Sequence, residues 1–295
     1  MFPHEVWNKK KGSSGDFIIN NFNKQEELPM HAVIPYYNLN AEQKKGIISA
    51  NQKLYKKPPK KKRHLYSTIY KLSEEPGYIE VDLVEHNGGN SKGEFIYTLC
   101  GVDVKTYWVF LRPLKNKARV WTIEALDDII NSSPFTVYHI HSDNGSEFIN
   151  IHLLEYCRER GIRFTRSREH ASNGNPHVEN RNMVVVRRYV GYARYDTEKE
   201  LKVLKELYYY IELRHNFFIP TMRLITKEKV GKKYKRVYET KTPYQRIIED
   251  PSVPELIKEA LMEFKKKLDI VKINKTIIKL YNQLEKTHRK KEVNP

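Results

Sequence analysis

The chain has 295 residues, 39% of them hydrophobic, which is enough to bury one core and to form one or two smaller modules. Lys and Arg outnumber Asp and Glu by 53 to 36, and the formal net charge of +17 favours a polyanionic partner. No apolar run approaches the roughly 18 residues that span a bilayer, and the first residues lack the apolar region of a signal peptide. Composition therefore favours nucleic acid over a membrane as the partner.

The two cysteines, Cys100 and Cys157, form no CxxC pair. A zinc finger and a disulfide framework are therefore both disfavoured. This cysteine usage predicts a protein of the reducing cytoplasm.

Residues 1–75 are expected to form a basic N-terminal extension. Residues 41–55 have the pattern of one helix, which leads into a run with seven basic residues and two prolines between Lys53 and Arg63. A phosphate-tracking arm and a solvated charged linker explain this run equally well. Its candidate DNA contacts are Lys60, Lys61, Lys62 and Arg63.

The segment 76–216 has the pattern of a mixed α/β domain. Three strand patterns come first, at 78–86, 94–103 and 105–112. They are followed by a helix at 116–131, a strand at 135–141, a helix at 146–160, a strand at 162–165, and helices from 175 and at 197–216. This order predicts a mixed sheet of about five strands, of which the first three are antiparallel.

The segment 217–295 is predicted to contain a basic β-hairpin followed by helices. Apolar and basic residues alternate over 223–241 around Gly231, and eight residues of this stretch are Lys or Arg. Helical patterns follow at 254–268 and 273–287. The candidate DNA contacts in the hairpin are Lys232, Lys233, Lys235 and Arg236.

Three carboxylates occupy positions from which they can meet. Asp82 lies within the first strand, Asp143 follows the fourth strand at a turn, and Glu179 lies in the first turn of the helix from 175. Each also has an ordinary interpretation. Asp82 could pair with a buried Arg, Asp143 could be a turn residue, and Glu179 could complement the helix dipole. Together they suit Mg²⁺, and two such ions about 4 Å apart assist phosphoryl transfer. A basic chain with this site would act on nucleic-acid backbones.

The spacing and the local sequence of these carboxylates resemble a known family. Thirty-five residues lie between Asp143 and Glu179. Three motifs occur in order: Val-Asp-Leu-Val-Glu-His at 81–86, His-Ser-Asp-Asn-Gly-Ser-Glu-Phe at 141–148 and His-Val-Glu-Asn-Arg-Asn at 177–182. They resemble the Asp-Asp-Glu catalytic core of retroviral integrases and bacterial insertion-sequence transposases, over roughly residues 65–285.

The resemblance implies a ribonuclease-H-like fold, which is a five-stranded mixed sheet flanked by helices. It implies that Asp82, Asp143 and Glu179 are the catalytic residues and also the ligands of two Mg²⁺ or Mn²⁺ ions. The implied activity is DNA strand cleavage and strand transfer by a homo-multimer that acts on transposon ends and target DNA. Such a protein is expected to be cytoplasmic and nucleoid-associated, with no membrane partner.

Other residues near the three carboxylates are candidates for supporting roles. The possible active-site neighbours are His86, Asn144 and His177. His86 shares a strand face with Asp82, although a histidine packed in the core is the more ordinary interpretation. Arg187 lies about 80° from Glu179 around an ideal helix, which makes it a candidate contact for a DNA phosphate.

Two alternatives from other classes remain open. One is a two-metal nuclease of the same fold that cuts DNA without joining it, and the other is a domesticated, non-catalytic DNA-binding derivative. The front of the chain shows at most the last helix of the helix-turn-helix region that such transposases usually carry, which favours the derivative. Asn180, Arg181 and Met183 also stand where the family usually has Gln, Lys and Trp. The three intact carboxylates favour an enzyme.

Overall fold

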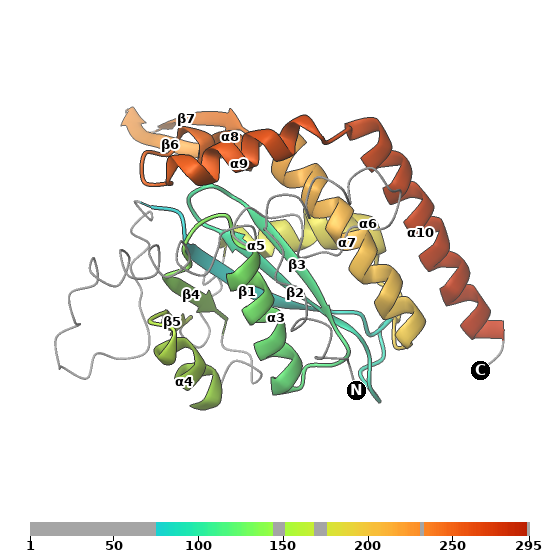
Figure 1. Cartoon of the computed structure of the whole chain (residues 1–295). Coiled ribbons are helices and arrows are strands. Elements are labelled where there is room, and N and C mark those ends of the chain that lie inside the picture. Colours follow the sequence, from blue (N-terminus) through green and yellow to red (C-terminus); the bar gives the residue numbers. More distant parts are fainter. Residues whose placement is uncertain (1–74, 144–150, 168–175, 231–232, 294–295) are drawn as a thin grey trace, which may run out of the picture. The chain divides into compact units, whose positions relative to one another are not determined.

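A five-stranded mixed sheet lies at the centre of the described chain (Figure 1). The computed structural model describes residues 75–143, 151–167, 176–230 and 233–293, all within a unit that spans Ile34–Pro295. The predicted extension up to residue 74 lies outside the described residues, and so do five of the candidate DNA contacts and one active-site neighbour: Lys60, Lys61, Lys62, Arg63, Lys232 and Asn144.

The strand order in the sheet is β3-β2-β1-β4-β5. β2 pairs antiparallel with both β1 and β3, whereas β4 runs parallel to both β1 and β5. The strands are β1 (Tyr78–Glu85), β2 (Tyr97–Asp103), β3 (Val109–Leu114), β4 (His139–Ser142) and β5 (Arg163–Arg166). The predicted five-stranded mixed sheet is confirmed, and its first three strands are antiparallel as expected.

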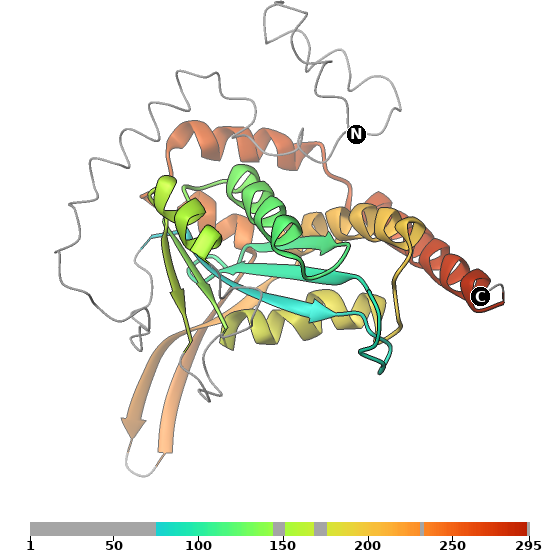
Figure 2. The ribbon, with the colours of Figure 1, turned by 90° about the horizontal axis from the view of Figure 1, so that it is seen from below.

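Helices cover both faces of this sheet, so its strands are largely buried on both sides. Every residue of β2 and of β3 is buried. In Figure 2, α3 (Arg119–Ser132) and α4 (Ile151–Glu159) lie on one face of the sheet, and the helical stretch 176–190 lies on the other. Ile79 and Leu126 are among the fully buried side chains of the core.

β3 begins later than the sequence predicts, because a tight turn occupies residues from Lys105 onward. The carboxylate of Asp103 accepts hydrogen bonds from the backbone N–H of Thr106 and from its hydroxyl, each at 2.7 Å. Tyr107 in this turn has a φ of 63°, a left-handed conformation that is uncommon for a bulky side chain. Side-chain hydrogen bonds therefore fix the β2–β3 turn where strand pairing was expected.

The long helix expected from residue 175 is a composite. α5 (Pro176–Arg181) passes directly into a π-helix, η5 (Asn182–Arg187), and then into α6 (Arg188–Val190). Gly191, with a φ of 63°, follows the last helical residue. A π-helix is wider than an α-helix because its hydrogen bonds span five residues. The side chains of η5 therefore point in directions that a regular helix would not give them.

The next helix, α7 (Glu198–Phe218), confirms the prediction for 197–216. It begins with a capping box in which Thr197 and Glu200 each accept a hydrogen bond from the backbone of the other. One side of α7 is buried against β3, and this side includes Tyr208 of the Tyr208-Tyr209-Tyr210 run.

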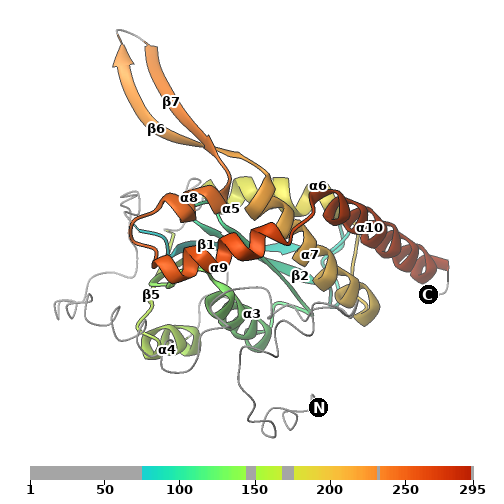
Figure 3. The ribbon, with the colours of Figure 1, turned by 45° about the horizontal axis from the view of Figure 1, so that its top comes forward.

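The tail contains the predicted hairpin and helices. The hairpin is an antiparallel pair of strands that projects away from the sheet and its helices (Figures 2 and 3). A short helix that the sequence analysis did not predict follows it. The elements are β6 (Thr221–Val230), β7 (Lys233–Lys241), α8 (Pro243–Glu249), α9 (Glu255–Lys266) and α10 (Ile270–Val293). Within the described ranges, no helix is both long and apolar enough to cross a membrane.

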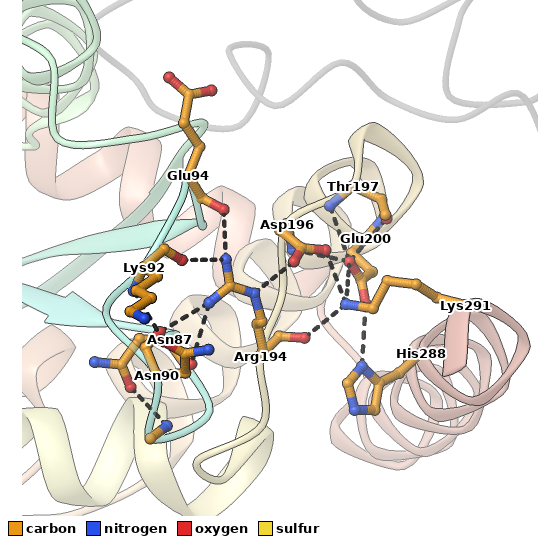
Figure 4. A network of polar contacts seen from close by, with 11 residues as sticks. Asn87, Asn90, Lys92, Glu94, Arg194, Asp196, Thr197, Glu200, His288 and Lys291 are labelled. Atoms are coloured by element: carbon orange, nitrogen blue, oxygen red, sulfur yellow. Dashed lines mark hydrogen bonds and ion pairs between the residues drawn. The ribbon is translucent and has the colours of Figure 1, made fainter. Parts of the chain in front are cut away.

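A polar network joins the start of α7 to α10 and to the β1–β2 loop (Figure 4). The fully buried carboxylate of Glu200 accepts hydrogen bonds from the backbone of Thr197 at 2.9 Å and from Lys291 of α10 at 3.1 Å. The guanidinium of Arg194 donates to the carbonyls of Asn90 at 2.8 Å and of Lys92 at 3.0 Å. The network therefore ties three segments, distant in the sequence, to one point.

A second buried ionic group joins the sheet edge to two helices. Arg112 of β3 is nearly fully buried and forms ion pairs with Asp128 of α3 and Glu212 of α7. Its remaining donors reach the hydroxyl of Ser132 at 2.9 Å and the carbonyl of Leu111 at 3.0 Å. Because the group is buried, removing one partner should lower the stability of the fold, since a remaining charge would be left uncompensated away from water.

We expect Arg112→Met to destabilise the fold by about 3–5 kcal/mol, since Glu212 would be left as a buried charge without its cation. Arg160→Met is the matched control: Arg160 pairs with Asp127 at 2.6 Å, but both side chains are substantially exposed, so its loss should cost about 0–1 kcal/mol. Urea unfolding of both variants measures the difference. Equal losses would show that burial does not govern the Arg112 group.

Candidate active site

Asp82 is held by two hydrogen bonds at the centre of the candidate site. It lies in β1, and the strand alternation turns its side chain toward the face that carries α5. Its Oδ1 accepts a hydrogen bond from the backbone N–H of Leu83 at 2.9 Å. Its Oδ2 accepts one from the side-chain amide of Asn182 at 2.6 Å. Both carboxylate oxygens thus have a donor.

Asp143 follows the last residue of β4, directly beside Asp82. The parallel register pairs Val81 of β1 with Ser142 of β4, so the next residue on each strand is one of the two acids. Because the strands are parallel, the two acids lie side by side where the pairing of β1 with β4 ends, although β1 itself continues to Glu85. Strand pairing, which the sequence only suggested, thus brings the two residues together.

Glu179 comes from the layer of helices that covers the sheet, whereas the two aspartates lie in or directly after strands of the sheet itself. It lies in the first turn of α5, which packs against β1 and β2. Burial raises the pKa of Asp82 to about 6, and the negative charge of Asp143 and then that of Glu179 add to the rise. Both acids are therefore close enough to Asp82 to act on its charge.

The donor set suits a hard divalent cation, because three carboxylates repel one another and a cation relieves that repulsion. Across residues 75–143, 151–167, 176–230 and 233–293, however, no three His, Cys, Asp or Glu side chains are grouped tightly enough to hold an ion as they stand. The chemistry of the three acids fits a metal ion. In this structure the carboxylate of Asp82 accepts a hydrogen bond from the side-chain amide of Asn182.

Glu80 is a site residue that the sequence analysis missed. It lies two residues before Asp82 and is fully buried. Its Oε2 accepts hydrogen bonds from the backbone N–H groups of His177 at 3.0 Å and Val178 at 3.2 Å, at the start of α5. Burial raises the pKa of Glu80 to about 7. This carboxyl therefore fastens the helix that carries Glu179 to the strand that carries Asp82.

Glu80 also has an oxygen with no partner. Its Oε1 is buried and makes no hydrogen bond within the described residues, and the same holds for Oδ1 of Asn182. Alternation along Ile-Glu-Val-Asp at 79–82 places Glu80 on the same face as Asp82, and this signal was available in the sequence. Nothing in the sequence indicated that Asn182 would reach Asp82, because its direction depends on η5.

Of the predicted histidine neighbours, His86 is buried and His177 is half-buried, and burial lowers the pKa of each. His86 lies in the core, with its Nε2 at 2.7 Å from the hydroxyl of Thr98, and its pKa falls to about 3. This is the core placement considered in the sequence analysis. The ring of His177 lies 5.3 Å from that of Tyr107, and its pKa falls to about 4. His177 contacts the β2–β3 turn, next to the start of α5.

The remaining predicted DNA contacts lie apart from the carboxylates. Arg187 donates to the carbonyls of Glu85 at 2.9 Å and of Gly191 at 3.1 Å. Its guanidinium is therefore engaged with the backbone in this structure. Lys235 and Arg236 are exposed on the hairpin, and Lys233 is the first residue of β7.

Residues 73–172 match the family model described as "Integrase core domain". The matched segment contains Asp82 and Asp143, whereas Glu179 lies beyond its end. The five-stranded mixed sheet flanked by helices is the ribonuclease-H-like architecture expected for such a domain. The resemblance found in the sequence is confirmed by this match.

One curated protein, "Uncharacterized protein y4rM" of Sinorhizobium fredii, is 34% identical over 168 residues, which make up 57% of this chain and 48% of that protein. The chain thus spans about half the length of the curated relative it matches.

Two solved structures are similar at low identity. The simian T-cell lymphotropic virus intasome in complex with PP2A regulatory subunit B56 gamma is 15% identical, over 65% of this chain and 58% of that chain, with a TM-score of 0.41. The HTLV-2 integrase catalytic core domain in complex with magnesium is 18% identical, over 50% of this chain and 90% of that chain, with a TM-score of 0.37.

We expect Glu80→Ala to lower the free energy of unfolding by about 1–3 kcal/mol, because two buried N–H groups lose their acceptor. The amides of His177 and Val178 should then exchange with deuterium faster than in the wild type. Glu80→Gln keeps an oxygen acceptor at the same position and should restore most of the protection. If Gln proves as damaging as Ala, the negative charge and not the acceptor is what holds α5.

Proposed function

We propose that this chain is a metal-dependent DNA strand transferase of the Asp-Asp-Glu kind, which cleaves DNA and joins the cut strand to a second DNA. One observation carries the proposal: Asp82 in β1 lies beside Asp143, which follows the adjacent parallel strand β4, in a segment that matches the integrase core domain, and Glu179 is close enough to act on the charge of Asp82. Residues 76–216 would form the catalytic core, and residues 217–295 would form a module that contacts DNA.

The three acids would together hold two Mg²⁺ or Mn²⁺ ions, which are hard cations that prefer carboxylate oxygen. When bound, such ions activate a water or a 3′-hydroxyl and stabilise the leaving oxygen. Asp82 would exchange the amide of Asn182 for the ions. Glu80 would keep the first turn of α5 against β1, so that Glu179 stays opposite the two aspartates.

DNA is the partner that the charge of the chain favours, since a net charge of +17 suits a phosphate backbone. Transposon ends and target DNA would be the substrates. Two ends must be joined to one target, so a homo-multimer would supply the active sites. The segment before residue 75 and the hairpin would add positive charge on either side of the catalytic core in the sequence.

We expect Asp82→Asn, Asp143→Asn and Glu179→Gln each to abolish cleavage and joining while DNA binding remains. Each substitution keeps the size of the side chain and removes the charge that a cation needs. The assay uses labelled duplexes copied from the DNA that flanks the coding region, with Mn²⁺ and a target plasmid. Glu85→Gln is the matched control, because Glu85 is exposed on the other side of the same strand, and it should leave joining unchanged.

The same assay separates the other two functions. Cleavage products without joined products in the wild type would favour a nuclease of the same fold. Binding without metal-dependent chemistry in the wild type would favour a domesticated DNA-binding protein. Full activity in the Glu179→Gln variant would remove Glu179 from the proposed site.

Metal binding has a readout that is independent of catalysis. A cation that binds the folded state alone raises the apparent stability with its concentration. We therefore expect Mn²⁺ to raise the melting temperature of the wild type and of Glu85→Gln, and to raise it much less in Asp82→Asn. Differential scanning fluorimetry with and without chelator measures this shift. An equal shift in Asp82→Asn would place the metal elsewhere.

A further inference from the structure

The hairpin of β6 and β7 has two chemically different faces. Residues that stand directly opposite each other in an antiparallel pair share a face. The pairs Leu224↔Tyr238 and Lys227↔Arg236 lie on one of these faces. We call this face the basic face; its exposed residues are Met222, Leu224, Lys227, Tyr234, Arg236, Tyr238 and Thr240.

A β-bulge decides which residues reach the basic face. The register shifts between Leu224 and Thr226, and Ile225 is the unpaired residue. Before the bulge, even-numbered residues of β6 lie on the basic face, and after it odd-numbered residues do. The shift is what places Lys227 opposite Arg236, with its Nζ 4.6 Å from the centre of the Tyr234 ring.

The opposite face carries both acids of the two strands, which offset part of its positive charge. Arg223 and Glu239 are directly opposed there and form an ion pair at 3.1 Å. Glu228 and Lys235 are also directly opposed on that face. Glu228 and Glu239 are the acids of the two strands. Both therefore lie on the opposite face, and neither offsets the positive charge of the basic face.

The basic face, by contrast, carries a charge that nothing on it compensates. Lys227 and Arg236 are like charges in directly opposed positions, an arrangement that destabilises a strand pair. Neither side chain forms an ion pair with any residue of the described ranges. Lys227 and Arg236 are both exposed, and the exposed tyrosines Tyr234 and Tyr238 lie on either side of Arg236 along β7. An anion placed between the two cations would relieve the repulsion.

The root of the hairpin is fixed close to the candidate active site. Arg223 donates to the carbonyl of Lys105 at 2.9 Å, and Arg246 donates to the carbonyl of Thr106 at 3.3 Å. Both carbonyls belong to the β2–β3 turn, whose Tyr107 contacts His177 at the start of α5. The hairpin is therefore attached to the turn that contacts the start of α5, the helix that carries Glu179.

We infer that the basic face of the hairpin is a docking surface for the phosphate backbone of duplex DNA. This inference takes DNA as the partner from the proposed function, on which it rests, and it adds which face of the hairpin contacts the DNA. Lys227 and Arg236 bind phosphates, and Tyr234 and Tyr238 supply hydroxyl donors and flat contact area beside them. Lys235, on the opposite face, does not contact DNA, although the sequence analysis counted it among the candidates.

The test compares variants that lose the same charge from different faces. Arg236→Gln and Lys235→Gln are neighbours in sequence, both exposed, and each removes one positive charge. Affinity of the full chain for a labelled duplex of arbitrary sequence is measured by fluorescence anisotropy over a range of salt. We expect the slope of log affinity against log salt to fall by about 0.9 in Arg236→Gln, and by about twice that with Lys227→Gln added. Lys235→Gln should leave it unchanged.

Three outcomes overturn the inference. An equal fall in Arg236→Gln and Lys235→Gln shows that the arm acts through its total charge. An unchanged slope in the Lys227→Gln, Arg236→Gln double variant places the DNA elsewhere on the chain and leaves the proposed function standing. No salt-dependent binding by the wild type removes DNA as the partner, and with it both proposals. Circular dichroism of each variant confirms that the fold is intact.

A second copy of the chain is the competing occupant of the basic face. Sedimentation of the double variant decides this point. A change in oligomeric state with an unchanged salt slope overturns the docking of DNA in favour of contact between copies. An unchanged oligomeric state with a reduced slope supports DNA.

Discussion

The parallel pairing of β1 with β4 is the constraint on which the rest of the structure depends. It puts Val81 opposite Ser142, and so brings Asp82 and Asp143 side by side at the point where this pairing ends. Two parallel strands need a long crossover connection, and here the connection contains β2, β3 and α3. The antiparallel half of the sheet and its covering helix are thus the means by which two distant acids become neighbours.

The candidate site is held together by groups other than its three acids. Glu80 fixes the start of α5 through backbone N–H groups, and Asn182 reaches Asp82 from the first residue of η5. Each leaves one buried oxygen without a hydrogen bond in the described residues, which is costly in a dry interior. π-Helical turns are frequent at functional sites. Local cost of this kind is typical of a site shaped for a ligand.

Periodicity predicted the sheet because its strands are buried and separated by polar or glycine-rich turns. It marked Asp82 because a charge interrupts an apolar strand, yet Glu80 carries the same signal and escaped notice, since its partners lie nearly a hundred residues away. α8 also escaped, although Thr242 and Gln245 form a capping box that the sequence displays. The π-helix has no such signature in the local sequence.

The bulge at Ile225 separates what the hairpin presents from the direction in which it points. A shift of one residue would move every later side chain to the other face of a strand, and the bulge absorbs one extra residue so that Lys227 stays opposite Arg236. Loss of the Ile225 codon would therefore leave the faces of β6 unchanged and would straighten the strand, because a bulge bends and twists it. The root at Arg223 would keep its contact with the β2–β3 turn. Lineages with this hairpin can re-aim it without changing the side chains that it presents.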